Sequence, residues 1–128
     1  MAHPFSILDG HNYMSLTTFR KSGEGVPTAV WFAREGDVLY MTTMREAGKA
    51  KRIRHTPRVT MTPCKGNGQL LGSEKVEGVI RVLDANESQA AKDALKRKYG
   101  FQLQMFNLMG WVTRSLDNRI YLEIKPAS

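Results

Sequence analysis

Short runs of alternating apolar and polar residues recur along the chain, separated by turns rich in glycine or containing proline. Such alternation is typical of strands with one face in a core and the other in solvent. The first three runs follow one another closely and are predicted to form a meander. Three more follow later, so the pattern predicts a mainly β fold. The six predicted strands are Tyr13–Arg20, Val26–Ala33, Val38–Thr42, Val59–Pro63, Glu74–Leu83 and Asn118–Pro126.

Two segments, 87–99 and 101–110, instead carry apolar residues three or four positions apart and predict short helices. Asn86 is placed to cap the first of them, and Gly100 to end it. The basic residues of this helix, Lys92 among them, are expected to form a solvated face.

Because short strands dominate and the helices are small, we expect a closed or nearly closed antiparallel barrel. Within the fifth strand Gly78 predicts a bulge or a close approach of another segment. Residues 1–12 are expected to form an N-terminal arm with one helical turn near Phe5 to Leu8. Residues 13–126 are expected to form a single domain.

The most distinctive stretch joins the third and fourth predicted strands. Thr43 and Glu46 have the Thr-x-x-Glu spacing of a capping box, which predicts a helix that starts at about Met44. Pro57 lacks the amide that a helix interior needs and disfavours helical geometry at the residue before it. The helix is therefore expected to end near His55.

This helix carries four cations almost in a row. Gly48 precedes them although glycine costs a helix about 1 kcal/mol relative to alanine. Without a Cβ at this position a phosphate can lie against the first turn, where unpaired amides and the helix dipole favour an anion. A solvated basic helix packed on the barrel is the alternative interpretation. The cations are Lys49, Lys51, Arg52 and Arg54.

The chain has 128 residues and a formal net charge of +7. That length fits one core, and that charge attracts phosphorylated cofactors, acidic substrates, nucleic acid or anionic lipid without choosing among them. A single cysteine, Cys64, excludes an internal disulfide, and no apolar run has the length of a signal or a membrane span, so we expect a cytoplasmic protein. The histidines show no metal-ligand spacing, so no metal site is expected.

Three stretches together carry a family resemblance: VPTAVWFAREGDVLYMTT, GKAKRIRHTPRVTMTPC and VEGVIRVLD. They resemble the split-barrel superfamily of pyridoxamine 5'-phosphate oxidases, and more closely its small oxidoreductases that depend on the deazaflavin coenzyme F-420. The similarity runs from Tyr13 to about Lys125. It implies a six-stranded antiparallel split β-barrel of the FMN-binding type, which forms a homodimer and binds a flavin or deazaflavin at the subunit interface.

The resemblance also implies which residues bind the cofactor. Lys49 matches the phosphate-binding lysine of the family, and the neighbouring Lys51 and Arg52 extend that assignment. Thr43, with Thr42 beside it, matches a hydroxyl close to the phosphate. A segment of the second strand matches the strand whose backbone contacts the polar edge of the flavin ring, and it comprises Pro27, Thr28, Ala29, Val30 and Trp31.

The chain departs from the oxidases at two places. Ala47 and Gly48 stand where the oxidases carry a Ser-Arg pair that helps to hold the FMN phosphate, and the long C-terminal extension is missing. Both departures count against FMN and against pyridoxal chemistry. A longer acidic cofactor tail, as in F-420, would suit the row of cations that continues past Lys49.

A reduced deazaflavin is itself the hydride donor, so the protein must hold it, orient it and exclude water. The sequence contains no convincing acid and base pair, which fits this division of labour. The leading hypothesis is an F-420-dependent reductase that acts on a quinone, an enone or a tetrapyrrole, with neither nucleic acid nor a membrane as partner. The alternatives are an FMN-dependent oxidoreductase, a carrier or sensor of a flavin or tetrapyrrole, and nucleic-acid binding by the basic helix.

Overall fold

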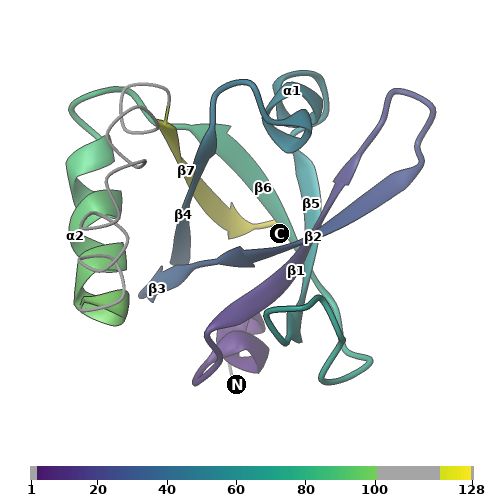
Figure 1. Ribbon diagram of the computed structural model, residues 1–128, viewed down its shortest axis with the longest axis horizontal. Helices are drawn as coiled ribbons and strands as arrows, with labels where there is room; N and C mark the ends of the chain where they lie inside the picture. Colours follow the sequence, from purple (N-terminus) through teal and green to yellow (C-terminus); the bar gives the residue numbers. More distant parts are fainter. Residues whose placement is uncertain (1–2, 101–118, 128) are drawn as a thin grey trace.

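The structure is a computed structural model and describes residues 3–100 and 119–127. These residues form one strongly curled antiparallel sheet in the order β2-β1-β5-β6-β7-β4-β3, with helix α1 over one end and helix α2 against the outer face (Figure 1). The mainly β split-barrel fold expected from the sequence is thereby confirmed. The strands are β1 (Tyr13–Phe19), β2 (Gly25–Trp31), β3 (Ala33–Glu35), β4 (Val38–Met44), β5 (Arg58–Cys64), β6 (Val76–Val82) and β7 (Arg119–Pro126). The helices are the 3-10 helix η1 (Pro4–Leu8), α1 (Gly48–His55) and α2 (Ser88–Tyr99).

The sheet has seven strands where six were expected, because the second predicted strand is divided at Phe32. Before this residue β2 pairs with β1, and after it β3 pairs with β4. The backbone of Phe32 bonds to a side chain instead: its N–H donates to the Tyr99 hydroxyl at 2.9 Å, and its carbonyl lies 2.8 Å from the same oxygen. Since β2 and β3 are also the two ends of the sheet, this corner brings the two ends of the sheet together.

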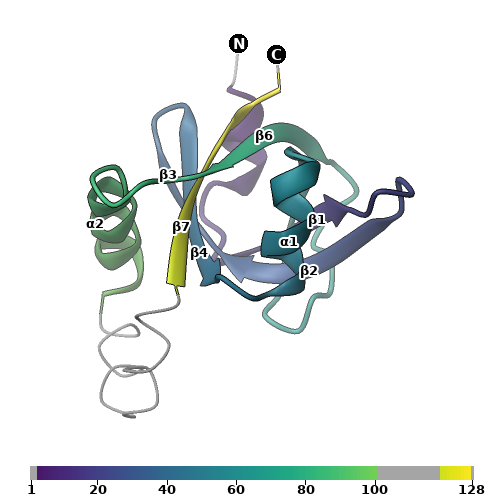
Figure 2. The same ribbon diagram turned by 90° about the horizontal axis from the view of Figure 1, so that it is seen from above.

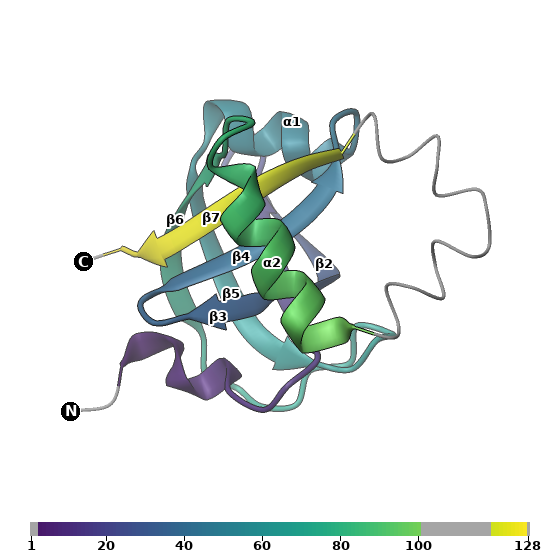
Figure 3. The same cartoon turned by 90° about the vertical axis from the view of Figure 1, so that its left-hand side faces the viewer.

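The corner is fastened to the last residue of α2. Tyr99 is 4% exposed, its hydroxyl lies 2.7 Å from the Asn12 carbonyl, and its ring stacks on Trp31 with centroids 4.4 Å apart. Gly100 ends the helix as predicted, with a φ of 36°. Figure 3 shows α2 crossing the outer side of the strands near this corner. One helix terminus therefore fixes where the sheet turns.

The start of α2 differs from the expectation that Asn86 caps it. The Asp84 carboxylate accepts from the Glu87 N–H at 2.8 Å, and the Glu87 carboxylate accepts from the Asp84 N–H at 3.3 Å. This is the reciprocal arrangement of a capping box. The basic residues of the following helix are exposed, as expected, although the Lys98 ammonium also lies 3.6 Å from the centroid of the Phe32 ring. The helix predicted at 101–110 falls outside the described residues.

Inward-facing residues of the strands fill the barrel, as the alternation predicted. The expected helical turn near the N-terminus is present as η1, and its Phe5 and Leu8 are fully buried in the same core. Gly78 makes the expected close approach, because a Cβ there would lie 2.5 Å from Cγ2 of Ile124. Among the described residues no helix is long and apolar enough to cross a membrane. The core residues from the strands include Met14, Leu16, Leu39, Met41, Val59, Met61, Ile80, Leu122 and Ile124.

The corner at Phe32 yields a prediction. Substitution Tyr99→Phe keeps the stacked ring and removes the hydroxyl, which leaves a buried N–H of Phe32 without an acceptor. We expect the free energy of unfolding to fall by about 1–3 kcal/mol in urea denaturation. The matched control is Tyr13→Phe, whose ring also contacts Trp31, and which should change stability much less.

The same variant has a pH signature. Burial raises the pKa of Tyr99 from 10.0 to about 12, so the folded state holds this proton more tightly than the unfolded state. The stability that follows is fully present below pH 10 and is lost as the pH rises toward 12. The wild-type protein should lose more stability over that window than Tyr99→Phe, and equal losses would contradict the role given to the hydroxyl.

Candidate functional site

The barrel is open between β2 and the second half of β4. Strand β3 pairs with β4 only over Val38–Tyr40, so Met41–Met44 pair with β7 on one side and have no strand partner on the other. Strand β2 pairs with β1 alone. Figures 1 and 2 show these two free edges diverging from the corner, with α1 lying above them. The expected cofactor strand therefore borders an opening in the sheet.

The edge of β2 presents its backbone to this opening. Arg20 donates its N–H to the Glu24 carbonyl at 2.9 Å and so closes the β1–β2 turn as a bonded pair. Because ladder hydrogen bonds alternate along an antiparallel strand, Ala29 then directs its N–H and C=O away from β1 and toward the opening. Pro27 has the same orientation, so its missing N–H does not interrupt the ladder. Backbone donors and acceptors on this edge suit the polar rim of a flat ring.

Side chains of the predicted ring-binding strand divide between the two faces. Val30 is 8% exposed and belongs to the barrel core, and Thr28 shares its face. Trp31 packs on the other face against Tyr99, beneath α2. A ring in the opening could therefore contact only the backbone of this strand and the side chains on its outer face.

The two threonines of β4 also point to opposite faces. Thr43 pairs with Ile120 and is 6% exposed on the core side. Thr42 lies on the outer side, where its hydroxyl donates to the Ile120 carbonyl at 2.9 Å. The turn from Glu35 to Val38 sets the alternation of β4, so the backbone N–H and C=O of Thr42 face the opening.

The predicted capping box at the end of β4 is wrong. The ladder with β7 continues to the Met44–Arg119 pair, so Thr43 stays extended and α1 begins only at Gly48, with Ala47 as an N-cap that makes no side-chain hydrogen bond. Pairing of the whole strand outweighs one local cap. The predicted end at His55 is confirmed.

Lys49 lies in the first turn of α1 and is half-buried. Burial and then the nearby Arg52 guanidinium hold the pKa of its ammonium below the usual value. No carboxylate of the described residues forms an ion pair with it. A cation that has lost water without gaining an acidic partner attracts an anion, and the N–H groups of the first helical turn favour the same charge.

The other cations of α1 differ in their contacts. Arg52 donates its Nε–H to the Thr18 hydroxyl at 2.6 Å, and its guanidinium fills the space beside Gly48, where a Cβ would lie 3.0 Å from Nη1. The missing Cβ at Gly48 thus makes room for Arg52. Arg54 donates to the Arg45 carbonyl at 3.1 Å, and Lys51 is exposed.

A second feature of this end of the barrel could not be predicted from the sequence. A cavity on the outer face of β7 is bordered by Arg45, Lys92 and Arg119, and Lys92 is exposed, as its assignment to a solvated face predicted. These residues lie far apart along the chain, and only the pairing of Met44 with Arg119 brings the first and last of them to one end of the sheet.

The fold and its opening define a split-barrel protein, and the sequence shows which family of split-barrel proteins it belongs to. The pyridoxamine 5'-phosphate oxidase family matches residues 5–127, so the chain belongs to that family and has its flavin-binding fold. No curated protein sequence matches the chain.

Solved structures with the same fold have names that describe different functions and different ligands. An F-420 reductase is 23% identical, with a TM-score of 0.62 over 97% of this chain and 93% of the other. An FAD-binding protein from Mesorhizobium loti is 16% identical, with a TM-score of 0.68 over 95% and 86%. The heme storage protein HutZ from Vibrio cholerae is 9% identical, with a TM-score of 0.68 over 95% and 86%. At these identities the likeness shows the fold alone.

The contact between Arg52 and Thr18 predicts an anchoring role for this arginine. Thr18 is fully buried, so Arg52→Met leaves its hydroxyl unpaired and should cost about 1–3 kcal/mol of stability. The double variant with Thr18→Val removes both partners and should recover part of that loss, with a coupling energy of about 0.5–3 kcal/mol. Lys51→Met on the same helix is the control and should change stability little. Additive effects at Arg52 and Thr18 would contradict the anchor.

Proposed function

We propose that the protein is an oxidoreductase that binds the deazaflavin coenzyme F-420 in the opening between β2 and β4 and passes hydride from it to an unsaturated organic acceptor. The observation that carries this proposal is Lys49, a half-buried cation without an acidic partner in the described residues, in the first turn of a helix above that opening. A phosphate on Lys49 and on the amides of this turn would leave the attached ring to extend along the free strand edges.

The chain's own groups would bind and orient the cofactor. The backbone of Ala29 and that of Thr42 face the opening and suit the hydrogen-bonding edge of the ring. Trp31, stacked on Tyr99, stiffens the end of β2 next to that edge. F-420 supplies the hydride when bound, so the protein needs no nucleophile of its own.

A homodimer belongs to the same proposal. The opening exposes strand edges that one chain leaves without strand partners, and a second copy could cover a bound ring and exclude water from it. The acceptor would be a quinone, an enone or a tetrapyrrole. FMN bound in the same opening is the alternative cofactor.

The titration of both cofactors tests the proposal. F-420 carries lactate and glutamate carboxylates beyond its phosphate, so exposed cations such as Lys51 should favour it over FMN. Exposed ion pairs are worth only about 0.2–1 kcal/mol each and are screened by salt, so the preference should shrink as salt rises. The measurement is the affinity of each cofactor at low and moderate salt, with sedimentation run on the same samples.

Turnover is then measured from the absorbance of reduced F-420 mixed with each acceptor. Oxidation that depends on both protein and acceptor is expected. Tighter binding of FMN at every salt concentration would replace F-420 by the alternative cofactor. Binding of F-420 without turnover on any acceptor would make the protein a carrier.

Charge reversal at Lys49 tests the phosphate contact. Lys49→Glu should weaken F-420 binding about ten- to a hundredfold, which corresponds to the loss of one charge-assisted contact of about 1.5–3 kcal/mol. Lys96→Glu makes the same change in net charge at an exposed position of α2 and should have little effect. Equal losses in the two variants would show that only overall charge matters and would remove Lys49 from the site.

A further inference from the structure

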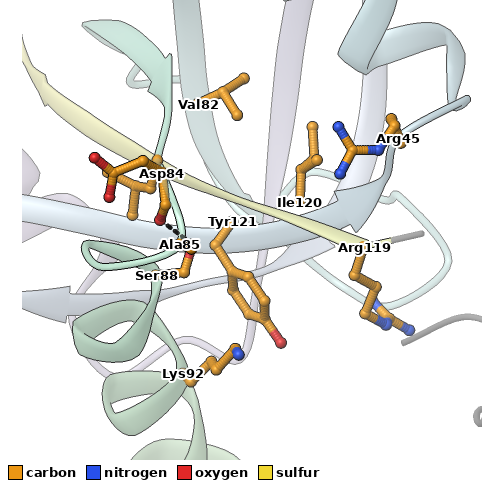
Figure 4. Close-up of a pocket in the computed structure, with 10 residues that line it drawn as sticks. Arg45, Val82, Asp84, Ala85, Ser88, Lys92, Arg119, Ile120 and Tyr121 are labelled. Atoms are coloured by element: carbon orange, nitrogen blue, oxygen red, sulfur yellow. Dashed lines mark hydrogen bonds between the residues drawn. The ribbon is translucent and has the colours of Figure 1, made fainter. Parts of the chain in front are cut away.

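The cavity on the outer face of β7 lies away from the opening. It has a volume of about 670 Å³ and is bounded by the first residues of β7, the connection from β6 to α2, the start of α2 and the turn after β4 (Figure 4). The opening borders the other edge of β4, so the cavity and the opening lie on opposite sides of this strand. Cavities of about 300–1,000 Å³ are the size that takes small organic ligands.

Three cations from three different elements surround this cavity. Arg45 comes from the turn after β4, Lys92 from α2 and Arg119 from the start of β7. In the part of the chain that the structure describes, none of the three forms an ion pair with a carboxylate. Their mutual repulsion is therefore not relieved by the protein itself, and an anion in the cavity would relieve it.

The acidic residues on the opposite wall are already engaged. Asp84 is the one carboxylate among the described lining residues, and it accepts from the Glu87 N–H at 2.8 Å. Figure 4 shows its carboxylate turned away from the Tyr121 hydroxyl. Glu87 in turn pairs with Arg81 at 2.6 Å, which fixes this wall. The hydrogen bond leaves the charge of Asp84 in place, but three cations against one carboxylate give the described lining an excess of positive charge.

The remaining lining is apolar or aromatic. The ring of Tyr121 forms part of the wall, with the Lys92 ammonium 5.4 Å from its centroid. Val82 and Ile120 border the cavity from the core side of the sheet, because Val82 pairs with the core residue Leu122, whereas Tyr121 points to the outer side. An apolar body stacked on the Tyr121 ring would remove part of that ring from water.

We propose that this cavity binds an organic carboxylate with an aromatic or conjugated body, held by Lys92 and Arg119 through its carboxylate and by the Tyr121 ring through its flat apolar part. Charge and surface both select this class: the cations require an anion, and the wall between them requires a flat apolar group. The inference uses no residue of the opening and stands whether or not F-420 binds there.

The probe is 2-naphthoate, and its neutral isostere 2-naphthamide is the matched control ligand. Calorimetry on the unmodified protein should show naphthoate binding at least tenfold tighter than naphthamide, with the difference falling as salt rises. In amide NMR spectra the shifts should centre on Lys92 and Tyr121 rather than on Ala29 and Thr42. Equal affinities of the two ligands, or shifts centred on the opening, would overturn the proposal.

Substitutions of single cations test which of them bind the carboxylate of naphthoate. Arg119→Gln and Lys92→Gln should each weaken naphthoate binding about three- to tenfold and leave naphthamide unchanged. Lys96→Gln lies on the exposed face of α2 and should change neither affinity. An equal loss in Lys96→Gln would mean that the probe senses only net charge and would overturn the site. If these two variants fail to fold, the two-ligand comparison on the unmodified protein decides the question.

Discussion

The hydrogen bonds between the Tyr99 hydroxyl and the backbone of Phe32 are the constraint on which the shape of the barrel depends. A residue at which the chain leaves one strand partner and takes another cannot satisfy its N–H within a ladder, and a buried unpaired N–H costs about 1–3 kcal/mol. Tyr99 accepts that N–H from the end of α2. The corner in turn forces β2 and β4 to diverge, so the opening exists because a helix terminus stabilises the turn of the sheet.

The electrostatics of the opening follow from the same geometry. Strand β4 keeps its pairing with β7 to the end, and only then does the chain turn into α1, which brings Lys49 above the opening. Gly48 is open to a large neighbour, and the guanidinium of Arg52 fills that space while its Nε–H bonds Thr18. Arg52 thereby positions the helix, and Lys49 is left as the half-buried charge.

The sequence was sufficient to predict the strands and the barrel, because alternation reports burial directly and the core residues follow it. It could not place the helix start. Thr43 with Glu46 and Asp84 with Glu87 have the same spacing, yet only the second pair forms a capping box, since β7 holds Thr43 in a ladder. The two sequence motifs predict a capping box equally well, and pairing with a distant strand determines which of them forms one. The division at Phe32 was likewise invisible, because its acceptor lies 67 residues away.

The net charge of +7 is not gathered on one face of α1, as the row of cations in its sequence suggests. Arg52 bonds a buried hydroxyl and Arg54 bonds the Arg45 carbonyl, so half of that row is engaged by the protein itself. A helix that binds nucleic acid through phosphates needs its cations presented together on one open face. Here Arg45 faces the cavity by β7, while Lys49 lies in the first turn of α1 above the opening on the other side of β4. The charge is divided between the cavity by β7 and the helix above the unpaired strand edges, an arrangement that suits small anionic ligands better than a continuous polyanion.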